Sequence, residues 1–143
     1  ISFSDDGATS WSPIAFDEGL YEPICMAAIV QLPKLFAGND STFVFSTPDS
    51  SSNPAFHGKN RFRHRENVTV RLSSDDCRTW PVSRVLEPGI SGYSDLAVAS
   101  DGTIYCLYER GGDDGFAEVF DLVDAACTGL LEHLVDEHDL PAE

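Results

Sequence analysis

The chain has 143 residues, a length typical of one domain that buries its own core. It carries 24 acidic residues against 9 Lys and Arg residues, and this formal charge of −15 argues against nucleic acid or an anionic membrane as the main partner. No apolar run approaches the ~20 residues of a membrane-spanning helix. The sequence opens at Ile1 without a recognisable signal peptide, so a mature product and a fragment both remain open.

Short strands separated by turns are predicted for the first 110 residues. Apolar or alternating segments rich in β-forming residues indicate strands at 24–32, 42–46, 67–73, 96–99 and 103–108. In the third segment, alternation with a period of two puts Val68, Val70 and Leu72 on one face. The Ser-Asp-Gly sequence at residues 100–102 is typical of a β-hairpin turn between the last two strands.

The end of the chain has a different pattern. Between Phe116 and Leu134 apolar residues recur with a helical period, which predicts an amphipathic α-helix. We therefore divide the chain into a β domain at residues 1–110 and an acidic helical tail at residues 111–143. The tail contains ten acidic residues and no Lys or Arg.

Most basic side chains lie in the middle of the chain. Seven of them fall between residues 59 and 84: Lys59, Arg61, Arg63, Arg65, Arg71, Arg78 and Arg84. A solvated strand edge and an anion site, in which guanidinium pairs with carboxylate or phosphate, both explain this cluster. The four Cys and four His residues lack metal-ligand spacing, so we predict neither a metal nor another cofactor, and two disulfides or buried free thiols both remain open.

A short motif occurs twice in the β domain. Residues 4–11 and 73–80 share the pattern Ser-x-Asp-x-x-x-[Ser/Thr]-Trp. In each copy the Asp is expected to accept N–H groups of the turn and the Trp to pack beneath it. The motif residues are Ser4, Asp6 and Trp11 in the first copy and Ser73, Asp75 and Trp80 in the second. Repeated turns of this kind predict radially arranged sheets, as in a β-propeller.

The two motifs resemble the Asp-boxes (BNR repeats) of the sialidase, or neuraminidase, family, whose pattern is S-x-D-x-G-x-T-W. Ala8 and Cys77 stand in the place of the glycine. The segments 65–80, 93–96 and 101–109 are similar, in the same order, to the C-terminal part of the catalytic domain of bacterial exo-α-sialidases. The resemblance implies an all-β fold, a portion of a six-bladed β-propeller of the sialidase type, followed here by the predicted C-terminal α-helix.

The resemblance also implies a site for a terminal sialic acid. Arg65 matches the third arginine of a triad that binds the sugar carboxylate, Tyr93 matches the nucleophile, and Glu109 matches a carboxylate that positions the first arginine. A neutral phenol suits this substrate because a carboxylate nucleophile would be repelled by the carboxylate on the anomeric carbon. The reaction implied is glycoside hydrolysis with retention.

Without the family, each of these residues has a plainer interpretation. Tyr93 would be a packed strand aromatic, Arg65 a surface residue, and Glu109 a carboxylate at a strand end. The F/Y-R-I-P segment that carries the family's first arginine does not occur, and every Arg lies at or after Arg61. We therefore expect a sialidase whose catalytic set is incomplete in this chain, with little or no turnover by the chain alone.

The alternative is a non-catalytic Asp-box propeller module that binds glycan or protein. The expected partner is a sialylated glycan, with no nucleic acid and no membrane span. An arc of a propeller exposes open sheet edges, so either self-association or a missing N-terminal propeller portion is expected to complete it. The resemblance favours an extracellular or periplasmic location.

Overall fold

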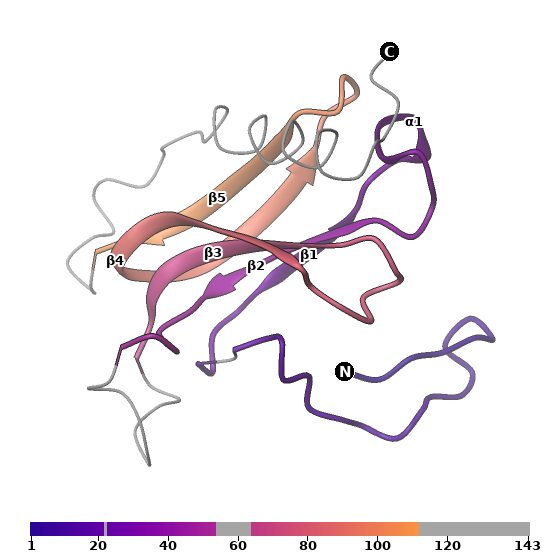
Figure 1. Ribbon diagram of the computed structural model, residues 1–143, viewed down its shortest axis with the longest axis horizontal. Helices are drawn as coiled ribbons and strands as arrows, with labels where there is room; N and C mark the ends of the chain where they lie inside the picture. The colour runs from indigo at the N-terminus through magenta and orange to yellow at the C-terminus, as the bar shows by residue number, and fades with distance from the viewer. Residues whose placement is uncertain (22, 54–63, 112–143) are drawn as a thin grey trace.

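The computed structural model describes residues 1–21, 23–53 and 64–111 (Figure 1). The elements, in chain order, are β1 (Ala28–Gln31), α1 (Lys34–Ala37), β2 (Phe43–Pro48), β3 (Glu66–Ser73), β4 (Val82–Val98) and β5 (Ile104–Arg110). The prediction of an all-β fold is thus confirmed, and the helix predicted between Phe116 and Leu134 lies outside the described residues. In the described part of the chain, no helix has the length and apolar character needed to cross a membrane.

The strands form an antiparallel meander in which each strand pairs with the next along the chain. β4 is 17 residues long and takes part in two sheets, because residues 82–90 pair with β3 and residues 91–98 pair with β5. We call β1, β2, β3 and residues 82–90 the first sheet, and residues 91–98 with β5 the second sheet. Figure 1 shows β4 curving from the side of β3 to the side of β5.

One hydrophobic core is shared by the two sheets. Its buried residues are Leu32, Ala37, Val44, Val70, Leu72, Val82, Leu96, Ile104 and Cys106. Val68, Val70 and Leu72, which the alternation placed on one face, are 0%, 0% and 1% exposed. Burial of such a side chain contributes about 1.5–3 kcal/mol, and the shared core stabilises the second sheet, whose two strands alone would be marginal.

Each predicted strand overlaps an observed one. The apolar run at 24–32 is only partly a strand, since pairing with β2 is confined to Ala28–Gln31. The predicted hairpin is confirmed: the Ala99 N–H donates to the Thr103 carbonyl oxygen at 2.8 Å, and Gly102 adopts a φ of +90° that favours glycine.

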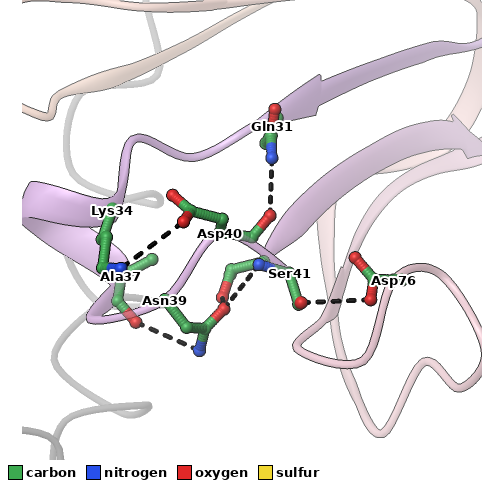
Figure 2. Close-up of polar contacts among 8 residues, drawn as sticks. Gln31, Lys34, Ala37, Asn39, Asp40, Ser41 and Asp76 are labelled. Atoms are coloured by element: carbon green, nitrogen blue, oxygen red, sulfur yellow. Dashed lines mark hydrogen bonds and ion pairs between the residues drawn. The ribbon is translucent and has the colours of Figure 1, made fainter. Parts of the chain in front are cut away.

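The loop between α1 and β2 fixes the turn that follows β3. Asn39 Oδ1 accepts the N–H of Ser41 at 2.7 Å, and the Ser41 hydroxyl donates to Asp76 at 3.1 Å (Figure 2). The Asp76 N–H in turn donates to the Ser41 carbonyl oxygen at 3.1 Å. The turn at residues 73–80 is therefore attached to the start of β2 by a reciprocal pair of bonds.

Candidate functional site

The turn at residues 73–80 is closed by the carboxylate of Asp75. This carboxylate accepts the Thr79 hydroxyl at 2.7 Å, the Thr79 N–H at 2.9 Å and the Ser73 hydroxyl at 2.8 Å. These donors favour the charged form and lower the pKa of Asp75 to about 2, the Thr79 hydroxyl making the largest contribution. The Ser73 hydroxyl also accepts the N–H of Cys77 at 3.0 Å.

The turn at residues 4–11 has the same set of bonds. Asp6 accepts the Ser10 N–H at 2.9 Å, the Ser10 hydroxyl at 2.7 Å and the Ser4 hydroxyl at 2.9 Å. The Ser4 hydroxyl accepts the N–H of Ala8 at 2.8 Å. The pKa of Asp6 is likewise lowered to about 2, chiefly by the Ser10 N–H. The two motifs therefore fold into the same local structure.

Both turns keep a left-handed backbone where the family pattern has glycine. Ala8 has a φ of +69° and Cys77 a φ of +62°. For a residue with a Cβ this conformation costs about 1–2 kcal/mol. The hydrogen bonds of each turn hold the backbone there, so Ala8 and Cys77 adopt a conformation that glycine would favour.

The two tryptophans have different surroundings. Trp80 is half-buried: its ring centroid lies 5.7 Å from that of Phe45 on β2, and its Nε1 donates to Asp17 at 3.3 Å. Trp11 is 61% exposed. Trp80 therefore packs against Phe45 of β2, whereas the exposure of Trp11 does not fit the expected packing beneath its turn.

The three residues assigned to the sialic acid site lie together. The Arg65 guanidinium lies over the ring of Tyr93, 5.0 Å from its centroid, and Tyr93 is 41% exposed. The Glu109 carboxylate accepts the backbone N–H of Tyr93 at 3.0 Å. The backbone is held as well, because the Ser91 N–H donates to the Arg65 carbonyl oxygen at 3.2 Å. A cation, a phenol and a carboxylate thus meet where β4 changes partner.

Gly92 leaves the space that the Glu109 carboxylate occupies. A Cβ at Gly92 would collide with Glu109 Oε2. Glycine at this position therefore allows the carboxylate to lie close over β4, within reach of the Tyr93 N–H.

The Arg65 guanidinium is held on its other side by the main chain. It donates to the carbonyl oxygen of Ile24, a residue with a φ of +56°, which is rare for a β-branched side chain. Burial lowers the pKa of Arg65, but its hydrogen bond to Tyr93 and the neighbouring Cys25, Tyr93 and Glu109 raise that pKa above its ordinary value. Arg65 is therefore a fixed, permanently charged donor at the surface.

Arg71 has a different environment from Arg65. Its side chain is 9% exposed and forms an ion pair with Asp49. Burial raises the pKa of Asp49, but bonds from Ser51 and the charge of Arg71 lower it below its ordinary value. Arg71 is thus held in a largely buried ion pair through Nη2, and among the described residues its buried Nη1 has no hydrogen-bond partner.

The interpretation of the sequence missed two residues of this site. No pattern in the sequence around Ile24 indicated that its carbonyl oxygen would hold Arg65. Gly92 was also overlooked, although a glycine directly before the proposed nucleophile was a signal that a side chain approaches closely. Neither contact is visible from local spacing.

The first sheet is an antiparallel meander of four strands, and its last strand continues into the second sheet. Consecutive blades of a β-propeller are arranged in this way. The class of the protein is therefore a portion of a β-propeller. The chain is similar to a protein named sialidase from Micromonospora viridifaciens, with 35% identity over 112 residues, which are 78% of this chain. No protein-family model matches the chain.

A solved structure gives the same assignment. The Hadza microbial sialidase Hz136 superimposes with a TM-score of 0.60 and 30% identity over 76% of this chain. The chain spans 16% of the length of the curated relative and 20% of that of the solved one. The resemblance to sialidases is confirmed: the chain is related in sequence and in fold to one part of a sialidase.

Proposed function

We propose that the chain carries part of the sialic acid site of a sialidase, with Arg65 as a carboxylate-binding residue, Tyr93 as the nucleophile and Glu109 as a positioning carboxylate. The observation that carries the proposal is the position of the Arg65 guanidinium over the Tyr93 ring, beside the Glu109 carboxylate. Sialic acid offers one carboxylate, which the partly buried guanidinium of Arg65 is proposed to bind with charge-assisted bonds.

The step proposed for Tyr93 is a substitution with a defined electron balance. The phenol oxygen attacks the anomeric carbon and loses its proton to a carboxylate base. The glycosidic C–O bond breaks, and its electron pair leaves with the aglycone oxygen, which an acid protonates. Water then replaces the tyrosine oxygen, so the configuration is retained. The sequence lacks the segments that supply the acid and the first arginine in the family, so the chain alone is proposed to bind without turnover.

Two measurements test this proposal. The full chain is expected to release the fluorophore of a fluorogenic sialoside no faster than background. Release above background that Tyr93→Phe abolishes would contradict the proposal that the catalytic set is incomplete. Sialic acid titrated into the chain is expected to bind, and Arg65→Ala is expected to weaken binding about 10- to 100-fold, the loss of a charge-assisted bond of ~1.5–3 kcal/mol. Arg84→Ala is the matched control, since Arg84 is an exposed arginine of β4.

The second candidate is a non-catalytic module that binds glycan. It is favoured by the surroundings of Tyr93, where the described residues bring one arginine, Arg65, over the phenol ring and not a triad. Two results together would favour this candidate over an enzyme portion. Binding of sialic acid would survive Tyr93→Phe and be lost in Arg65→Ala. The fluorogenic sugar would not be released even when the rest of a sialidase propeller is fused to the chain.

A further inference from the structure

The pairing of β3 with β4 is irregular where β4 is about to change partner. The pair Glu66 and Ile90 is followed by the pair Val68 and Glu87, so β4 has an extra residue between the two pairs. Asn67, which lies between them on β3, has a φ of +58°, a left-handed conformation that asparagine adopts more readily than most residues. A β-bulge bends the strand that carries the extra residue and increases its twist. The bend of β4 therefore begins opposite Asn67.

The side-chain amide of Asn67 joins β4 to the end of β2. Its Oδ1 accepts the N–H of Gly89 at 2.9 Å, and its Nδ2 donates to the carbonyl oxygen of Asp49, the residue after β2, at 3.2 Å. The main chain adds a bond in the other direction, because the Asp49 N–H donates to the Asn67 carbonyl oxygen at 3.1 Å. An amide carries its acceptor and its donor on separate atoms, so one side chain serves both neighbours.

The hydroxyl of Ser91 makes the matching contacts from β4. It accepts the N–H of Val68 at 3.0 Å and donates to the carbonyl oxygen of Gly89 at 3.3 Å. Gly89 has a φ of +92°, a conformation that favours glycine, and side chains hold both its N–H and its carbonyl group. Ser91 is 1% exposed, so its hydroxyl depends on these protein partners. Asn67 and Ser91 thus fix the bulge from its two sides.

We propose that Asn67 and Ser91 are positioning residues, which hold the bend of β4 that brings Tyr93 to Arg65. Asn67 lies two residues after Arg65, and Ser91 lies two residues before Tyr93. Both side chains bond to main-chain groups, so they act through the backbone and not on a bound sugar. The consequence for sialic acid rests on the proposed function, whereas the arrangement of Arg65 and Tyr93 does not.

The direct contacts of Arg65 and Tyr93 tie these residues to two different segments. The Arg65 guanidinium donates to the carbonyl oxygen of Ile24, before β1, and the Tyr93 N–H donates to Glu109 on β5. The main-chain bond that joins the two strands at the site runs from the Ser91 N–H to the Arg65 carbonyl oxygen. Because a shift of one residue turns a strand's side chains to the opposite face, relaxation of the bulge would move the Tyr93 ring away from Arg65.

The test compares variants of the full chain. Asn67→Gly keeps a residue that favours the left-handed backbone and removes the amide, so it isolates the side-chain bonds. Asn39→Gly is the matched control, because Asn39 is also half-buried and its Oδ1 accepts the N–H of Ser41 and the hydroxyl of Thr42. Asn39 lies before the start of β2, whereas Asn67 bonds to the residue after its end. Ser91→Ala is the second variant; it removes only a hydroxyl and decides the outcome if Asn67→Gly does not fold.

Two measurements are made on each variant. The nuclear Overhauser effect between the Arg65 side chain and the Tyr93 ring reports their contact without a ligand, and a titration with sialic acid reports binding. In Asn67→Gly and in Ser91→Ala we expect this Overhauser effect to fall well below that of the unmodified chain. Binding is expected to weaken about 5- to 10-fold, less than in Arg65→Ala, because the charge-assisted bond is displaced and not deleted. Asn39→Gly is expected to leave both measurements unchanged.

The contact between Arg65 and Tyr93 decides the positioning role. An Overhauser effect of full strength in either folded variant would overturn the proposal, and so would its absence from the unmodified chain. An equal loss in Asn39→Gly would also overturn it, since the loss would then reflect general loosening of the sheet. If the unmodified chain shows the contact but does not bind sialic acid, the proposed function fails and the Overhauser effects of the variants still decide the role of Asn67 and Ser91.

Discussion

Because the backbone at Cys77 is left-handed, we expect glycine at this position to be more stabilising than alanine, the reverse of the usual order. At most positions, replacing alanine by glycine destabilises a protein by about 0.5–1 kcal/mol, because glycine loses more conformational freedom on folding. At Cys77, where φ is +62°, the Cβ also carries a cost of about 1–2 kcal/mol. The balance favours glycine by about 0.5–1 kcal/mol.

Comparison of two variants isolates this backbone effect. Cys77→Ala removes the half-buried thiol and keeps the Cβ, and Cys77→Gly removes both, so the difference between the two variants measures the Cβ alone. We expect Cys77→Gly to unfold at a temperature about 2–4 °C above that of Cys77→Ala in a thermal melt followed by circular dichroism. The bond from the Cys77 N–H to the Ser73 hydroxyl is available in both variants.

A control comes from the turn at residues 4–11, where a glycine is replaced by alanine and stability is expected to fall. Gly7 has a φ of +70°, and a Cβ built there has no atom within 4 Å, so Gly7→Ala adds only backbone strain. This variant is expected to lower stability. If Cys77→Ala proves as stable as Cys77→Gly, the left-handed conformation does not carry the cost assigned to it and the reasoning fails.

Three further predictions concern the carboxylates of the chain. Gly92→Ala displaces the Glu109 carboxylate from the Tyr93 N–H; chemical shifts at Tyr93 are expected to change, and unchanged shifts would contradict the close approach. The pKa of Asp75 is about 2 in the folded chain and near 3.8 when unfolded. The charged carboxylate therefore stabilises the fold above pH 3.8, and this contribution is lost as the pH falls toward 2. The free energy of unfolding in urea should fall between about pH 5 and pH 2, and Asp75→Asn should make this pH dependence weaker. Arg71→Met removes the ion-pair partner of the partly buried Asp49 and is expected to cost about 1.5–3 kcal/mol in urea unfolding. A loss no larger than that of Arg84→Met, at an exposed position of β4, would show that the pair is not structural.

The sequence predicted the local features of the fold well. The alternation in β3, the turn at residues 100–102 and the two repeated motifs each depend on neighbours within a few residues. Such features are set by side-chain period and turn chemistry, which a sequence displays directly. The strand over residues 82–90 was not assigned because its residues do not alternate, and its position depends on pairing with β3.

The surroundings of the two tryptophans could not be predicted from the motifs. Both turns have the same hydrogen bonds, yet Trp80 meets Phe45 and Trp11 is exposed. Trp80 has Phe45 of β2 beside it, and a motif of eight residues carries no information about such a neighbour. Burial is a property of the assembled sheets, so two motifs with the same pattern need not have the same surroundings.

The candidate site depends on the point at which β4 changes partner. Ile90 still pairs with Glu66, whereas Ser91 pairs with Arg110, and the Ser91 N–H bonds to the Arg65 carbonyl oxygen. This crossing brings Arg65, directly before β3, next to Tyr93, which is 28 positions later in the chain. Neither residue is distinguished by its local pattern, and family resemblance could point to them only as separate positions. The bend in β4 is what makes them one surface, so a substitution that straightens β4 should disconnect the proposed site even if every residue of the site is retained.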